Sequence, residues 1–472
     1  MSPEDLSGAN NAQSVLQTLW RDMALPDEAL THIQLTGKDP VFPSSFAVGA
    51  AAQVTMAAAA LAAAEIGFLR GGARQRVAVD MLAAAQECRS YFRIGGVEQE
   101  IHDKITGVYR CGDGGWVRIH ANFAHHRDGA LALLGCPTGP GTSKEAVTHA
   151  LARWTALDFE QAAAEAGLVV AAMRTFDEWD AHPQGIALAS QPLISITKIA
   201  DADPLPWPQE TPDTRPLQGI RVLDLTRIIA GPVCGRALAA YGADVMLVNS
   251  PHLPNIDTIA ETSRGKLSVH VDLRTGTGQS TLRQLLKDAR VFVQGYRPGG
   301  LEELGFGAAE AAKQRPGIVY VTLSAYGEHG PWSGRRGFDS LVQTASGFNH
   351  AEGLAAGIDG PRALPMQILD HASGYLMAFG TQVALMRQAA QGGSWHVRVS
   401  LARTARWLRS LGRVEGGLAC AMPSVDDYLE TTPSGFGDLT AVRHAARFAD
   451  TPAAWTRPSM PPGSHPPVWP ES

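Results

Sequence analysis

The chain has 472 residues, of which 45% are hydrophobic and 18% charged, and its formal net charge is −6. This length exceeds what one compact core needs and predicts two to three domains. The composition is typical of an ordinary globular protein. The slightly acidic balance gives no reason to expect nucleic acid or an anionic membrane as a partner.

The first residues, MSPEDLSGANNAQ, carry acids and amides where a secretory signal would have a basic and then an apolar stretch, so we expect no such signal. The most apolar run, residues 46–69, is rich in alanine and interrupted by Gln53 and Glu65, which predicts a buried helix and no membrane span. The five cysteines are scattered without a CxxC pair, which argues against a disulfide framework and a zinc site. A cytoplasmic protein fits these features best.

Residues 1–90 are expected to form an N-terminal helical region in which the alanine-rich helix is followed by a strand at 76–79 and a second helix. Residues 91–200 predict a small α+β domain, with a hairpin at 106–120 and helices at 124–134, 143–166 and 175–181. His120, His125 and His126 cluster in it without an acidic or cysteine partner at ligand spacing. We therefore expect solvated or core histidines and no metal site.

Residues 201–217 carry five prolines and are expected to form a linker. Beyond it, apolar strand candidates at 219–225, 243–250, 267–273, 289–296 and 317–327 alternate with helical segments. Residues 218–410 therefore predict an α/β fold with a Rossmann-like, doubly wound parallel sheet, followed by a tail at 411–472. The turn after the first strand lacks GxGxxG, and Asn249 stands where an acid would bind ribose, so no nicotinamide or flavin site is expected.

Asp370 stands between an apolar lead-in at 366–369 and a long alanine- and methionine-rich helical run that reaches about Gln388. A carboxylate at a helix start can cap unpaired backbone N–H groups, and this N-cap interpretation stays open for Asp370. The same position is expected to lower its pKa and to keep the carboxylate ionised at neutral pH.

An internal repeat appears when the chain is shifted by 320 positions, which lays residues 48–90 over residues 368–410. Both stretches show a long helix, a glycine-containing break, a V-x-V strand and a helix that ends in Arg-Ser. At this offset Asp370 faces Ala50, so only one of the two stretches carries the carboxylate.

A series of short motifs runs in one order through residues 217–339: LQGIRVLDLT, AGP, YGADV, SRGKLS followed by DL, VQGYRPG leading to LGF, SAYG, and GFD. This series resembles the N-terminal half of a family III CoA-transferase, the family of formyl-CoA:oxalate and carnitine CoA-transferases and, more distantly, of α-methylacyl-CoA racemase. Residues 44–200 resemble the second half of the same fold, and residues 423–472 resemble its return segment. The order of the halves is atypical, so the chain is interpreted as an out-of-phase tandem or as a permuted unit with a duplicated junction helix.

The resemblance implies that Asp370 is the catalytic nucleophile, which moves CoA from an acyl-CoA to a carboxylic acid through an acyl-aspartyl anhydride and an aspartyl-CoA thioester. CoA and acyl-CoA are then substrates, with no permanently bound cofactor and no metal. The family forms dimers of interlocked chains, so a homodimer is implied, intertwined if that assembly is retained. Backbone N–H groups near Gly347 or at the start of the Asp370 helix are expected to stabilise the oxyanion.

The resemblance also implies a set of contacts to CoA. Apolar and small residues would line the pantetheine arm, with Tyr296 near the adenine, and cationic residues would meet the phosphates. The residues of this set are Ile228, Ile229, Ala230, Gly295, Tyr296, Leu304 and Tyr326, with Arg264, Lys266 and Arg297 at the phosphates.

Two other functions stay open. A racemase needs a His–Asp pair at the α-carbon, but the histidine of its Gly-His-Asp motif is Phe338 here. His371 adjoins Asp370, yet neighbours in a helix diverge by about 100° and do not flank one carbon. A non-catalytic protein that binds acyl-CoA is the other alternative. The donor and acceptor acids are not determined by these motifs.

Overall fold

The structure is a computed structural model that describes residues 11–100, 102–208 and 214–470. The expectation about a signal at residues 1–10 and part of the predicted linker, 209–213, lie outside the described residues. The α-helices are α1 (Ala12–Asp22), α2 (Val48–Leu69), α3 (Met81–Glu87), α4 (Ala124–Leu133), α5 (Lys144–Leu151), α6 (Ala156–Glu165), α7 (Phe176–Ala181), α8 (Pro183–Ala189), α9 (Ala230–Ala240), α10 (Ile259–Thr262), α11 (Gly276–Asp288), α12 (Ala308–Gln314), α13 (Asp339–Ala345), α14 (Phe348–Ala355), α15 (Ile368–Gln391) and α16 (Leu401–Ser410). The 3-10 helices are η1 (Asp27–His32), η2 (Gly417–Ala419) and η3 (Asp426–Tyr428).

The strands form four sheets. Their bounds are β1 (Ile33–Thr36), β2 (Val77–Asp80), β3 (Phe92–Ile94), β4 (Val97–Glu98), β5 (Gly107–Arg110), β6 (Trp116–Ile119), β7 (Val170–Ala172), β8 (Ser195–Ala200), β9 (Arg221–Leu225), β10 (Asp244–Asn249), β11 (Lys266–His270), β12 (Val291–Gln294), β13 (Val319–Ser324), β14 (Ser394–Ser400), β15 (Leu429–Thr432), β16 (Leu439–Val442) and β17 (Ala446–Phe448).

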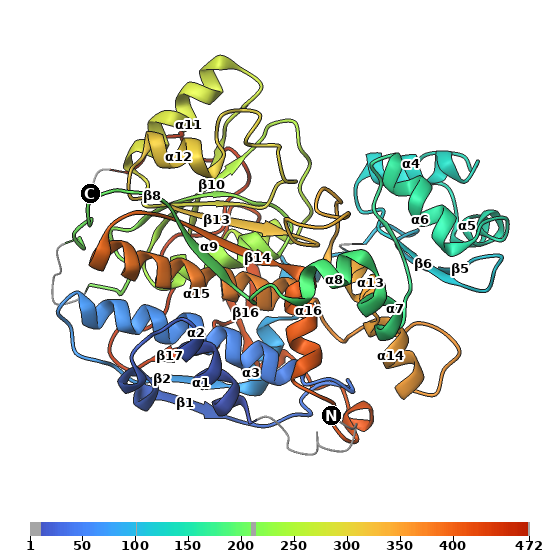
Figure 1. Ribbon diagram of the computed structural model, residues 1–472, viewed down its shortest axis with the longest axis horizontal. Coiled ribbons are helices and arrows are strands. Elements are labelled where there is room, and N and C mark those ends of the chain that lie inside the picture. The colour runs from blue at the N-terminus through green and yellow to red at the C-terminus, as the bar shows by residue number, and fades with distance from the viewer. Residues whose placement is uncertain (1–10, 101, 209–213, 471–472) are drawn as a thin grey trace.

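The largest sheet has the order β11-β10-β9-β12-β13-β14-β8, and all neighbours are parallel except β8, which is antiparallel to β14. Alternate side chains of its strands enter two separate cores: Val222 packs with α9 and α15, and Leu223 packs with α11 and α12. Helices therefore cover both faces (Figure 1). The predicted doubly wound α/β fold is confirmed.

Helix α2 is the alanine-rich helix of the sequence and lies side by side with α15 (Figure 1). By length and hydropathy alone it could cross a membrane, but 83% of its apolar window is buried inside this fold. It is apolar on all sides because α15, α1 and the sheet of β1, β2 and β17 enclose it. The predicted buried helix is confirmed.

The sequence repeat corresponds to a repeat of local structure. Helices α2 and α15 both follow a residue of the same unusual conformation, Ala47 (φ −76°, ψ 58°) and Gln367 (φ −78°, ψ 60°). Their following strands, β2 and β14, both lead into a helix that is capped by the strand's last side chain, from Asp80 and Ser400. Strand β8 of the first half pairs with β14, and β17 of the second half pairs with β2. Each half thus completes the sheet of the other.

The small domain stands apart at one end of the molecule (Figure 1) and has its own core between β5, β6, β7 and α4–α6. The single helix expected at 143–166 is wrong. The chain breaks between α5 and α6 because the Thr155 hydroxyl accepts the Asp158 N–H at 3.1 Å and starts a new helix. The expected domain 91–200 also ends in β8, which belongs to the large sheet.

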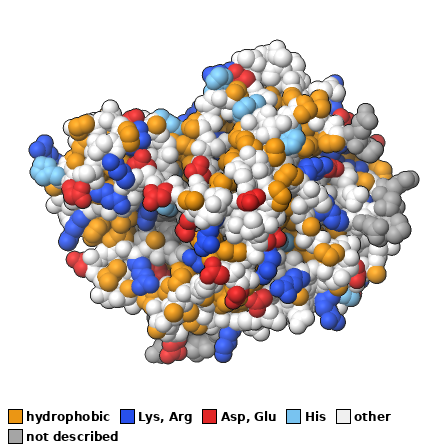
Figure 2. Space-filling model, turned by 180° about the vertical axis from the view of Figure 1, so that it is seen from behind, with side chains coloured by type: hydrophobic (Ala, Val, Ile, Leu, Met, Phe, Trp, Pro, Cys, Tyr) orange, Lys and Arg blue, Asp and Glu red, His pale blue; other side chains and the backbone are white. Residues whose placement is uncertain are grey.

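Seen from behind, basic and acidic side chains are interspersed over the surface (Figure 2).

Candidate active site

Asp370 lies in the first turn of α15 and is 6% exposed. The N-cap interpretation is wrong, because Gln367 occupies the cap position. The unpaired N–H groups of this turn are satisfied by Asp339 at the start of α13, whose Oδ2 accepts from Leu369 N at 2.7 Å and from Asp370 N at 3.0 Å. The carboxylate of Asp370 is therefore not used for capping and lines a cleft.

The first half of the chain repeats this capping arrangement. The Asp39 carboxylate accepts from Gly49 N at 3.1 Å and from Ala50 N at 2.8 Å, at the start of α2. Gly49 and Ala50 are the positions that the 320-residue offset pairs with Leu369 and Asp370. The capping carboxylate thus occurs in both halves, whereas a side chain able to act as a nucleophile stands only at Asp370.

The carboxyls of Asp370 and Asp339 both have a raised pKa. Burial raises the pKa of Asp370 well above its ordinary value, and the charge of Asp339 raises it further. Burial also raises the pKa of Asp339, to about 6. The expected low pKa of Asp370 is wrong because Asp339 already takes the helix N–H groups, and lost hydration then dominates.

The cleft in front of Asp370 has a volume of about 750 Å³, a size typical of sites for organic ligands. One wall belongs to the large domain and comes from the starts of α13 and α15 and from the loop between β9 and α9. The rest of the lining comes from the small domain and from residues 89–92 and 98–100, between α3 and β5. Large-domain residues of the wall include Ile228, Ile229, Phe338, Leu364 and Met366, and those of the small domain include Lys104, Arg118, His120 and Lys144. The site is therefore built from both halves of the chain.

The loop after β9 brings Ile228 and Ile229 to the cleft beside Asp370. Ile228 has φ 77°, which is rare for a β-branched residue and indicates a backbone held in place by its surroundings. On α15, Gly374 lets the start of α9 approach, since a Cβ there would lie 2.5 Å from the Ala230 carbonyl oxygen. Of the predicted CoA contacts, Ile228 and Ile229 are those that the structure brings to Asp370.

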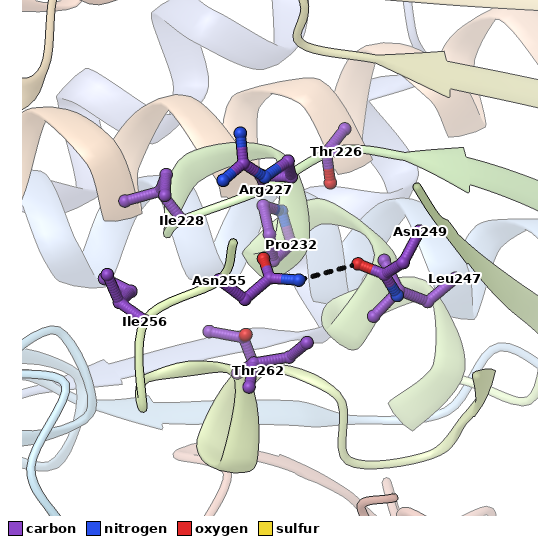
Figure 3. A pocket seen from close by; sticks show the side chains of 10 residues that line it. Thr226, Arg227, Ile228, Pro232, Leu247, Asn249, Asn255, Ile256 and Thr262 are labelled. Carbon is purple, nitrogen blue, oxygen red and sulfur yellow. Dashed lines mark hydrogen bonds between the residues drawn. The ribbon is translucent and has the colours of Figure 1, made fainter. Parts of the chain in front are cut away.

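Behind this loop lies a second cavity of about 10 Å³, at the carboxyl ends of β9 and β10 (Figure 3). Ile228 and Ile256 border both this cavity and the cleft. Asn249, at the end of β10, accepts a hydrogen bond from Asn255 Nδ2 at 2.9 Å. In doubly wound sheets ligands bind at the carboxyl ends of the strands, and this small cavity lies at that edge.

The predicted contacts after β12 lie at the same sheet edge but do not line the cleft. Tyr296 and Leu304 are half-buried against the core beneath α11 and α12, while Gly295 and Arg297 are exposed. Tyr296 is close enough to Arg227 for the two to interact electrostatically. Their role as CoA contacts stays a prediction.

Arg264 and Lys266 differ from the prediction, because the structure buries both in ion pairs away from the cleft. The Arg264 guanidinium binds Glu261 and the Val442 carbonyl and lies 3.9 Å from the centre of the Trp455 ring. Lys266 Nζ binds Asp224 Oδ2 and the Pro232 carbonyl, both at 2.8 Å. Neither cation is available to a phosphate in this arrangement.

Tyr326 and Gly347 also lie elsewhere than predicted. Tyr326 is buried against Trp179 and Trp332. Gly347 packs against Phe176 of α7, and the N–H groups at the start of α15 are occupied by Asp339. The expected sources of an oxyanion-stabilising N–H are therefore not supported.

The histidine cluster is largely buried. His120 stacks on Phe338 with ring centres 4.1 Å apart, and burial lowers its pKa to about 3. Burial also lowers the pKa of His126, to about 4. Within the described residues no group of three or more potential metal ligands is found. The sequence did not single out Arg118 or His120 as cleft residues, although Trp116, Arg118 and His120 alternate along one predicted strand and so share one face.

The site combines a buried carboxylate and a large cleft with a doubly wound sheet, a fold that binds ligands at the carboxyl ends of its strands. The sequence profile of CoA-transferase family III matches residues 217–412. The match falls on the residues that carry the motifs, and it supports the predicted resemblance to this family.

Individual relatives match the chain in part. An acyl-CoA transferase of Gibberella moniliformis is 32% identical over 317 residues, which cover 63% of this chain and 55% of the relative. The succinyl-CoA:glutarate CoA-transferase of Mus musculus is 33% identical over 201 residues, 39% of this chain and 45% of the relative. The crystal structure of Rv3272 from Mycobacterium tuberculosis is 32% identical, with a TM-score of 0.39, over 42% of this chain and 57% of that chain. The chain thus spans about half the length of the curated relatives it matches.

Proposed function

We propose that the protein is a CoA-transferase that moves CoA from an acyl-CoA to a carboxylic acid, with Asp370 as the nucleophile. The observation that carries the proposal is the free carboxylate of Asp370, which the capping by Asp339 leaves facing the 750 Å³ cleft. Relatives named as CoA-transferases, such as the one from Mus musculus, support this reaction class.

The reaction follows from one carboxylate and one thioester. An oxygen of ionised Asp370 attacks the thioester carbonyl, the carbon–sulfur bond breaks, and CoA leaves as thiolate with an acyl-aspartyl anhydride on the enzyme. The thiolate then attacks the aspartyl carbonyl and releases the first acid as a carboxylate. The acceptor carboxylate attacks the resulting aspartyl-CoA thioester and expels the thiolate, which finally attacks the new acyl carbonyl and regenerates Asp370.

The acid pair sets the protonation state of the nucleophile. Two neighbouring buried carboxyls do not ionise independently, so the raised pKa of Asp370 predicts that activity increases as pH rises through that pKa.

Ile228 and Ile229 are proposed to hold the pantetheine arm at the cleft. Ala230, Gly295, Tyr296, Arg297 and Leu304 are proposed to continue the CoA path along the sheet edge.

Transfer of CoA from a panel of acyl-CoA donors to a panel of carboxylic acids tests the proposal. Asp370→Asn is expected to abolish transfer, because an amide is not a nucleophile toward a thioester. Asp158→Asn is the matched control, since Asp158 is likewise the third residue of a helix but is exposed in the small domain. Full activity of Asp370→Asn, or acyl-CoA binding without any transfer by the wild type, would contradict the proposal. The second result would favour a non-catalytic binding protein.

Racemisation is tested separately because His120 shares the cleft with Asp370. A histidine with a pKa near 3 is a weak base at neutral pH. His371 is turned toward the first half and bonds the Ser90 hydroxyl at 2.7 Å. We therefore expect no exchange of the α-hydrogen of a 2-methylacyl-CoA in D₂O, and rapid exchange without CoA transfer would favour the racemase.

Within one chain, residues of the small domain line the cleft that holds Asp370. A homodimer stays a prediction that light scattering of the purified protein would test. The five free cysteines support a reducing compartment such as the cytoplasm.

A further inference from the structure

Ser90 and His371 form a hydrogen-bonded pair beside the nucleophile. Ser90 Oγ lies 2.7 Å from His371 Nε2, and His371 directly follows Asp370 in the first turn of α15. The Cα atoms of Asp370 and His371 are therefore about 3.8 Å apart. Ser90 lines the same cleft as Asp370, whereas His371 is fully buried and is not among the described residues that line the cleft. The histidine thus lies behind the serine, and a ligand in the cleft can reach the serine.

The backbone holds Ser90 in an uncommon conformation. Its φ is 54°, in the left-handed region that residues other than glycine rarely adopt. The side chain is 6% exposed, and the segment that carries it, residues 89–92, borders the cleft. Such a conformation persists only where the surrounding structure fixes it. The hydroxyl therefore has a defined position in the cleft wall.

The internal repeat contains this pair in one half only. The 320-residue offset pairs Ser90 with Ser410 and His371 with Ala51. The chain just after Ser410 forms a β-bridge with the segment that leads into α2, so the two serines have similar positions in the fold. The Ser410 hydroxyl is exposed and donates to a carbonyl of its own helix at 2.7 Å. The serine–histidine pair thus accompanies the carboxylate of Asp370.

The protonation state of His371 sets the direction of the hydrogen bond. Burial, and after it the charge of Arg236, lowers the pKa of His371 to about 3, so the imidazole is neutral at neutral pH. Its Nδ1 is buried without a hydrogen-bond partner among the described residues. Because unpaired buried N–H groups are rarer than unpaired acceptors, we assign the ring hydrogen to Nε2, which then donates to Ser90 Oγ. The Ser90 O–H, to which the described part of the chain offers no acceptor, is left to donate into the cleft.

We propose that Ser90 is a further catalytic residue, whose hydroxyl is oriented by His371 and donates a hydrogen bond to the carbonyl oxygen of the thioester. This inference rests on the proposed CoA transfer. When Asp370 attacks the thioester carbon, negative charge develops on that oxygen and stays there until the carbon–sulfur bond breaks and CoA leaves as thiolate. The Ser90 O–H keeps its proton throughout. A side-chain donor is needed because Asp339 occupies the N–H groups at the start of α15.

The test is steady-state CoA transfer by Ser90→Ala and Ser90→Gly at a pH on the activity plateau. Glycine adopts a positive φ without cost, so Ser90→Gly removes the hydroxyl without backbone strain. Both variants are expected to lower kcat by about 100- to 1000-fold and to change the KM for acyl-CoA little, because the hydrogen bond strengthens as charge develops on the oxygen. Ser410→Ala is the matched control from the other half and should behave as wild type.

His371→Leu tests the positioning role of the histidine. It removes the N–H that orients the hydroxyl but leaves the hydroxyl in place, so kcat should fall less than in Ser90→Ala. The double variant of Ser90→Ala and His371→Leu should be no slower than Ser90→Ala alone. His371→Gln should keep part of the activity, because its amide can donate to Ser90 Oγ. Losses that multiply in a folded double variant would show that the two residues act independently and would overturn the positioning role.

Three results would overturn the role of Ser90. They are a wild-type kcat in either folded Ser90 variant, a raised KM for acyl-CoA with unchanged kcat, and an acyl ester on Ser90 in peptides of the enzyme taken during turnover. The last result would make Ser90 a nucleophile.

Failure of the underlying function is distinguishable. If wild type transfers CoA to no acid and Asp370 is never acylated, the proposed transferase activity is wrong. If wild type transfers CoA and Ser90→Ala does so with the same kcat, only the role of Ser90 is wrong.

Discussion

Asp339 caps the N-terminus of α15 and places a negative charge beside Asp370, and Asp339→Asn is expected to remove the charge while keeping the cap. The Asn oxygen can still accept from Leu369 N and Asp370 N, which both bond Oδ2 in the wild type. The Asn NH₂ would then face the Gln343 amide NH₂, which donates to Asp339 Oδ1. The Gln343 amide cannot flip to avoid this contact, because its Oε1 accepts a hydrogen bond from Leu364 N at 3.0 Å that the flip would break. One unsatisfied pair costs about 1–3 kcal/mol of stability.

The same change removes a negative charge beside the nucleophile. The charge of Asp339 is one of the two causes that raise the pKa of Asp370, after burial. We therefore expect the pKa of Asp370 to fall in Asp339→Asn but to stay above its ordinary value, because the site remains buried.

The assay is the pH dependence of kcat/KM for CoA transfer, whose acid limb reports the nucleophile of the free enzyme. The acid limb of Asp339→Asn should shift to lower pH, while thermal unfolding shows the lost hydrogen bond. The reasoning is refuted if the acid limb stays in place or shifts upward while the variant remains folded and active.

Three further predictions concern burial and packing. Lys266→Met leaves Asp224 as an unpaired buried charge and should lower the free energy of unfolding by about 3–5 kcal/mol. The double variant with Asp224→Asn should recover much of this stability. A raised KM for CoA in a stable double variant would show that Lys266 does bind a CoA phosphate. Gly374→Val would press a Cβ against the Ala230 carbonyl oxygen and should destabilise the protein by about 1–3 kcal/mol and slow transfer, so unchanged melting and kinetics would contradict the contact. Asp370→Asn should stabilise the protein at pH 8 but not at pH 4. The folded wild type binds the Asp370 proton more tightly than the unfolded chain, because the pKa of Asp370 is raised in the folded state. The stability of the wild type therefore falls by about 1.4 kcal/mol for each pH unit between the ordinary pKa and the raised pKa. Equal melting temperatures of both proteins at both pH values would refute that raised pKa.

The large-domain fold was predictable because its strands are apolar runs separated by helices, a pattern that permits few topologies. Every strand predicted between residues 217 and 327 occurs, as β9 to β13. The partner of β14 was not predictable. Strand β8 is distant in sequence and is half-exposed, so its residues show no periodicity that would assign it to this sheet.

The position of Asp370 was predictable, but its electrostatic environment was not. A sequence places a carboxylate at a helix start, yet it does not show that another carboxylate, Asp339, takes the N–H groups there. Arg264 and Lys266 were misplaced for a related reason. Basic residues in a glycine-containing turn usually reach solvent, whereas here Glu261 and Asp224 bind them inside the fold.

The most direct test of the account is mass spectrometry of the enzyme trapped with hydroxylamine during turnover of an acyl-CoA. Hydroxylamine attacks the activated aspartyl carbonyl, so the account predicts a hydroxamate on Asp370, at one per chain, and none on Asp339 or Asp158. Turnover without any adduct on Asp370, or an adduct at another carboxylate, would contradict the central claim that this one residue carries the reaction.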